Sequence, residues 1–178
     1  MKKNEYTKTC NYPADALKIP ESPELERAVL GALLLESQYV ADVRGILTST
    51  AFCNTQNAAI YDAICKLDDR GSTPDLFTVG QEAKKAGIPL SEVAALTQNV
   101  GSGVEILNHA RILADLDMRR RLILWAEELK AKAQTAPDAL NWVMSGIERI
   151  AGDVARIASA RSIGDVMRDT LADLERRQ

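Results

Sequence analysis

The chain has few of the residue types from which catalytic and metal sites are built. It contains one histidine, His109, among 178 residues, which excludes histidine-based metal sites and disfavours a Ser-His-Asp triad. No lysine follows a glycine, so the phosphate-cradling G-x-x-x-x-G-K-[ST] loop is absent from this chain. The paired carboxylates, Asp68-Asp69 and Glu127-Glu128, are sequence neighbours and point about 100° apart on a helix, so neither pair shares a site. We expect no catalytic, cofactor or metal site here.

Cysteine, aromatic residues and long apolar runs are also scarce. The three cysteines, Cys10, Cys53 and Cys65, form no C-x-x-C pair, and without a signal peptide they indicate reduced thiols in a cytoplasmic protein. No apolar run approaches the roughly 20 residues of a membrane span, so no membrane partner is expected. Aromatic residues make up only 4% of the chain, which favours an aliphatic core between helices. The net charge of −3 argues against general attraction to nucleic acid.

The stretch IPESPELERAVLGALLL, residues 19–35, predicts an amphipathic helix with a well-marked start. Ser22 is the expected N-cap, and Pro23 occupies the first helical position, where its missing N–H costs nothing. Glu24 and Glu26 fall in the first turn, where the helix dipole favours acidic residues. One face carries apolar residues at the helical spacing, namely Leu25, Ala28, Val29, Ala32 and Leu33.

Further short helices are expected over residues 39–47, 56–69, 75–86 and 91–100. Asp75 is a plausible N-cap for the third of these, and Gly87 is the residue expected just past its end. No stretch shows the alternation of a β-strand. We therefore predict an all-α chain in which a flexible leader, residues 1–18, precedes a globular helical bundle, residues 19–103.

Residues 104–158 predict a long antiparallel α-hairpin. No proline or glycine occurs between Val104 and Ala133, which indicates a helix of about 30 residues and about 45 Å. A break at 134–137 leads into a second helix over 138–158, whose apolar residues follow a coiled-coil spacing. Counting back from the turn places Leu140 opposite Ala131 and Ile150 near Arg121. The predicted seam between the arms comprises Leu122, Trp125, Leu129, Leu140, Val143, Ile147, Ile150 and Val154.

Two groups on the hairpin are candidates for contact with a partner. Trp142 shares a face with Gly146 and Arg149, which we expect to point away from the other arm and to form a protein–protein contact; a tryptophan at the core edge is the alternative. Arg119, Arg120 and Arg121 form a basic band. The band is either a solvated face or a docking patch for an acidic partner or a DNA backbone.

The last segment, residues 159–178, predicts a linker helix. Ser162 and Asp165 fit a capping box at its start. Its apolar stripe, which must be buried against its own bundle or a neighbouring chain, comprises Ile163, Val166, Met167, Leu171 and Leu174.

Several segments, in order along the chain, resemble the N-terminal domain of DnaB-type replicative helicases. The most specific is the run A-V-L-G-A-L-L, residues 28–34, which follows a proline, a short polar gap and an acidic residue. The other matching segments are 46–47 with Phe52, 59–64, 70–71, 74–79, 108–113 and 120–123. Residues 88–103 depart from the family pattern, because they are short and lack its Gly-Gly-x-x-Tyr-Leu segment. The RecA-like ATPase domain is also missing from this chain.

The resemblance implies a domain that pairs through its hairpin, so that three pairs form the collar of a hexameric ring. It implies primase as a partner, in some systems a helicase loader, and DNA through the full-length ring. Trp142, Gly146 and Arg149 on the hairpin would then be contacts with a second copy or with primase. The linker helix would pack on the ATPase domain of an adjacent subunit. Hydrolysis of ATP with Mg would belong to that absent domain, so this chain is expected to be no enzyme. The alternative is a helical DNA-binding or regulatory adaptor without catalytic activity.

Overall fold

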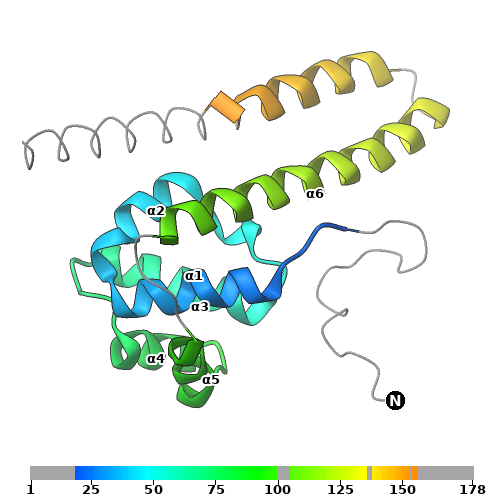
Figure 1. Ribbon diagram of the computed structural model, residues 1–178. Helices are drawn as coiled ribbons and strands as arrows, with labels where there is room; N and C mark the ends of the chain where they lie inside the picture. Colours follow the sequence, from blue (N-terminus) through cyan, green and yellow to red (C-terminus); the bar gives the residue numbers. More distant parts are fainter. Residues whose placement is uncertain (1–18, 100–104, 136–137, 153, 156–178) are drawn as a thin grey trace, which may run out of the picture. The chain divides into compact units, whose positions relative to one another are not determined.

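Helices form all the regular structure in the described residues of this computed structural model, which are 19–99, 105–135, 138–152 and 154–155. Figure 1 shows short helices in the first half of the chain and longer ones in the second. The chain divides into two compact units, residues 1–118 and 119–178. The all-α prediction is confirmed for the described part. The predicted leader and linker helix lie outside the described residues.

The described part of the first unit is built from five short α-helices, three 3-10 turns and the beginning of a long helix. The α-helices are α1 (Pro23–Leu35), α2 (Val40–Ile46), α3 (Thr55–Asp69), α4 (Leu76–Lys84), α5 (Leu90–Leu96) and α6 (Ile106–Thr135). The 3-10 turns are η2 (Ser37–Tyr39), η3 (Ser49–Ala51) and η4 (Thr97–Asn99). These bounds lie within a few residues of the predicted ones, because each helix carries its own apolar period and breaker residues.

The core of this unit is aliphatic, as the low aromatic content predicts. Its fully buried side chains include Val29, Leu30, Leu33, Val43, Ile60, Ile64, Val79 and Val93. Phe52 and Tyr61 add one aromatic pair, with ring centroids 4.9 Å apart. Ile106, Ala110 and Leu113 at the start of α6 are also buried, so the first unit extends beyond the predicted boundary at residue 103.

Helix α4 begins as the sequence predicts. Asp75 accepts hydrogen bonds from the backbone N–H groups of Phe77 and Thr78, both at 2.8 Å, and Thr78 completes a capping box. The backbone bond from Thr78 is the main cause of a lowered Asp75 pKa. Gly87 follows α4 with φ of +81°, the left-handed conformation that glycine adopts without strain.

The start of α1 differs from the prediction at Ser22 and at Glu26. Ser22 occupies the N-cap position, but its side chain makes no capping hydrogen bond. Glu26, predicted only as a favourable charge in the first turn, is fully buried. Its Oε1 accepts from the backbone N–H of Cys53 at 2.7 Å, and its Oε2 accepts from the Asn57 side chain at 2.9 Å and Asn54 N–H at 3.3 Å.

This carboxylate therefore lies at the N-terminus of α3. Asn54 caps α3 with its own side chain, accepting from Gln56 and Asn57 N–H. Glu26 bonds the N–H groups just ahead of the helix and adds a negative charge where the helix dipole is positive. Polar bonds thus join α1 to the start of α3 across 27 to 31 positions of sequence.

The second unit contains the rest of α6 and a helix over residues 139–152. The long helix is confirmed, since α6 spans 30 residues. Residues 136–137, within the predicted break, are not described. Among the described residues, no helix is both long and apolar enough to cross a membrane.

Replacing Glu26 with alanine should lower the free energy of unfolding by about 3 kcal/mol, because one buried and two half-buried donors lose their acceptor. Urea denaturation followed by circular dichroism measures this. Glu24→Ala, which removes an exposed carboxylate from the same turn, is the matched control and should have little effect. Equal stability of the two variants would contradict the role assigned to Glu26.

The lowered pKa of Asp75 predicts a small acid-dependent loss of stability. A carboxyl whose pKa is lower in the folded chain stabilises it fully above its unfolded pKa, and this contribution disappears as pH falls through the folded value. Asp75→Asn retains a capping oxygen but cannot titrate. Denaturation across acidic pH should therefore show a shallower loss of stability for Asp75→Asn than for the unchanged chain; identical profiles would contradict this.

Candidate protein-interaction surface

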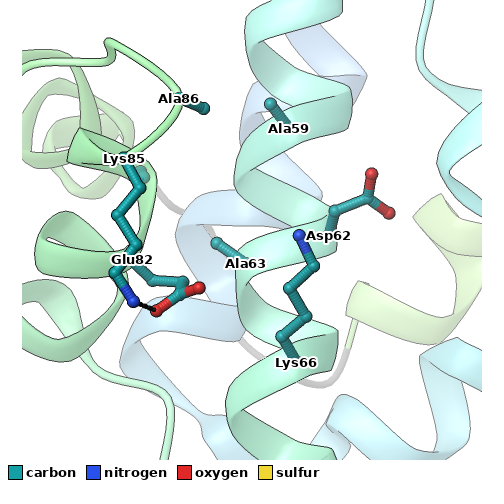
Figure 2. A pocket seen from close by; sticks show the side chains of 8 residues that line it. Ala59, Asp62, Ala63, Lys66, Glu82, Lys85 and Ala86 are labelled. Atoms are coloured by element: carbon teal, nitrogen blue, oxygen red, sulfur yellow. Dashed lines mark hydrogen bonds and ion pairs between the residues drawn. The ribbon is translucent and has the colours of Figure 1, made fainter.

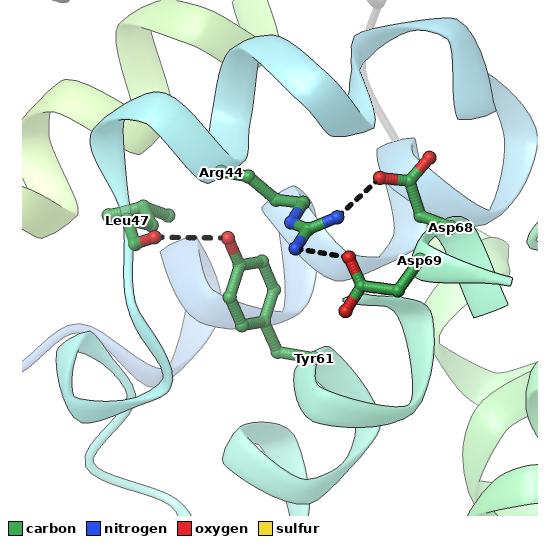
Figure 3. A network of polar contacts seen from close by, with 5 residues as sticks. All are labelled: Arg44, Leu47, Tyr61, Asp68 and Asp69. Atoms are coloured by element: carbon green, nitrogen blue, oxygen red, sulfur yellow. Dashed lines mark hydrogen bonds and ion pairs between the residues drawn. The ribbon is translucent and has the colours of Figure 1, made fainter. Parts of the chain in front are cut away.

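The polar cluster between α2 and α3 has a structural role. Arg44 donates from its two terminal nitrogens to Asp68 at 2.6 Å and to Asp69 at 2.7 Å (Figure 3). Both hydrogen bonds raise the pKa of Arg44. The Tyr61 hydroxyl donates to the Leu47 carbonyl oxygen at 3.2 Å, and burial raises its pKa. Adjacent carboxylates thus bind one guanidinium at the end of α3.

A groove between α3 and α4 also offers no arrangement of side chains suited to catalysis. Its volume is about 210 Å³, and Figure 2 shows Ala59 and Ala63 of α3 on one side and Ala86, just after α4, on the other. The lining residues are Ala59, Asp62, Ala63, Lys66, Glu82, Ala83, Lys85 and Ala86. Lys85 donates to Glu82 and is the main cause of that carboxyl's lowered pKa. Small side chains here let α3 and α4 approach, and the charges lie at the mouth of the groove.

The remaining candidates for a reactive or metal-binding site are His109, Cys53 and Cys65. His109 is half-buried on α6, with Nε2 3.8 Å from the Glu105 carboxylate. Cys53 and Cys65 are half-buried, and burial raises the pKa of the Cys65 thiol. Within the part of the chain that the structure describes, no group of three His, Cys, Asp or Glu side chains could hold a metal ion.

The hairpin confirms the predicted register along its axis. Arg121 of α6 and Ile150 of the second arm line one notch in the surface of the hairpin. This pairing is the one expected from counting back from the turn. Trp125 lies against Gly146, in the same register. The lengths of the two helices and the break between them are therefore sufficient to pair the arms correctly end to end.

The predicted orientation of the second arm about its own axis was wrong. Trp142 does not point away from α6: its ring stacks on Trp125 with centroids 5.8 Å apart and an interplanar angle of 21°. Gly146 is buried, and a Cβ placed on it would clash with the Trp125 ring. Lys132 lies over the Trp142 ring, 5.4 Å from its centroid. Trp125, Trp142 and Gly146 therefore form the inner seam.

As a result, some residues predicted for the seam between the arms lie on the inward face of the hairpin and others lie on its exposed face. Val143, Ile150, Trp125 and Leu129 are half-buried, whereas Leu140 is 82% exposed, Ile147 50%, Val154 51% and Leu122 40%. Met144, which was not predicted as a site residue, is 61% exposed. An indole needs a small residue opposite it, and Gly146 supplies that space, so the helix turns its tryptophan face inward. The heptad spacing alone cannot distinguish these two faces.

We name the exposed apolar residues of the second arm the outer stripe: Leu140, Met144, Ile147 and Val154. They are spaced by four, three and seven positions, so they lie along one side of the helix. Such a row of large apolar side chains is typical of an interaction surface. The coiled-coil spacing of Leu140, Ile147 and Val154 is visible in the sequence, but the structure leaves these side chains exposed and does not pack them against α6.

The three arginines of the predicted basic band do not share one exposed face. Arg119 is exposed and Arg121 half-buried, but Arg120 is only 5% exposed. Consecutive helical positions point about 100° apart, which explains the separation. Arg149, predicted beside Trp142, is exposed and lines the notch with Arg121. The linker-helix residues 163–174 lie outside the described part.

The sequence matches a family model described as "DnaB-like helicase N terminal domain" over residues 18–115. The chain belongs to this family. The "Replicative DNA helicase DnaB" of Rhodothermus marinus is 35% identical to it over 167 residues, which cover 88% of this chain and 17% of that protein. The protein of the same name from Treponema pallidum is 27% identical over 166 residues, which cover 89% of this chain and 38% of the relative.

A solved structure supports the same assignment for the fold. The crystal structure of the N-terminal domain of DnaB helicase from Mycobacterium tuberculosis matches with a TM-score of 0.64 at 23% identity. The match covers 78% of this chain and 99% of that one. The chain thus has the DnaB N-terminal fold, and it spans only a minor part of the length of the relatives named above.

Gly146→Ala should open the hairpin seam, because the added methyl group has no space beside Trp125. Overpacking of this kind costs about 2 kcal/mol, and it should weaken the near-ultraviolet circular dichroism of the stacked indoles. Gly152→Ala is the matched control, since a Cβ there meets nothing within 4 Å. The control should gain up to about 1 kcal/mol from helix propensity; a similar gain for Gly146→Ala would contradict the close packing.

Proposed function

We propose that this chain is the assembly domain of a replicative DNA helicase, and that it associates with a second copy through the outer stripe. The supporting observation is the row of exposed Leu140, Met144 and Ile147 on a helix whose tryptophan face already packs against α6. A heptad-spaced apolar row on a helix is buried most simply against the same row of another copy.

In a hexameric ring, such pairs would form the collar, as the family resemblance implies. Primase and, in some systems, a helicase loader would bind the collar. ATP hydrolysis with Mg and unwinding of the DNA that passes through the ring would belong to a separate RecA-like domain. The linker helix, with Ile163, Met167 and Leu171, would dock on a neighbouring subunit.

The alternative, a DNA-binding adaptor that uses Arg119 to Arg121, gains no support from the structure, because Arg120 is buried. The favoured function rests instead on apolar surface. Salt-dependent binding of a DNA duplex that is lost with these arginines would restore the alternative.

The combined substitution Leu140→Asp with Ile147→Asp should convert a dimer or larger assembly into a monomer, because charges cannot be buried in an apolar seam without a large cost. Sedimentation at several concentrations measures the mass. Leu35→Asp, at a residue of α1 that is 60% exposed, is the matched control and should leave the mass unchanged. A strictly monomeric unchanged chain, or equal effects of both variants, would refute the proposal.

A further inference from the structure

We draw no further inference here: the strongest candidate, the exposed apolar patch in the first unit that comprises Phe77 of α4 and Leu90 of α5, which lies against Gly80, carries none because nothing in the structure shows what covers it.

Discussion

The packing of Gly146 against Trp125 determines the organisation of the hairpin. An indole ring of one arm fits only where the other arm has no side chain, and Trp142 extends the contact by stacking on the same ring. This contact fixes the rotation of the helix over 139–152 about its axis. Once that rotation is fixed, Leu140, Met144 and Ile147 are left exposed, and the notch beside Arg149 is formed.

The first unit depends in a similar way on a single buried group. Glu26 joins α1 to the start of α3, and its carboxylate accepts hydrogen bonds from the backbone N–H groups of Cys53 and Asn54. A buried charge is tolerated here because three donors bind it at the positive end of a helix dipole. Helices too short to be stable alone thereby gain a fixed geometry from their partners.

In this member of the DnaB N-terminal family, the two units differ in what they contribute. The matched family region, residues 18–115, covers nearly all of the described first unit. The outer stripe lies on the hairpin, beyond that region. In the proposed assembly, the hairpin presents the contacts with a second copy.

The sequence by itself determined the helix boundaries, the all-α class and the end-to-end register of the hairpin. These follow from local signals: Pro23 at a helix start, the Asp75 cap, Gly87 after a helix end, and chain length on either side of a turn. Only the tertiary structure decided which face of the second arm packs inward and where Glu26 is placed. Apolar periodicity shows which residues share a face but not what that face packs against, because the space opposite an indole or a carboxylate is created by residues distant in the sequence.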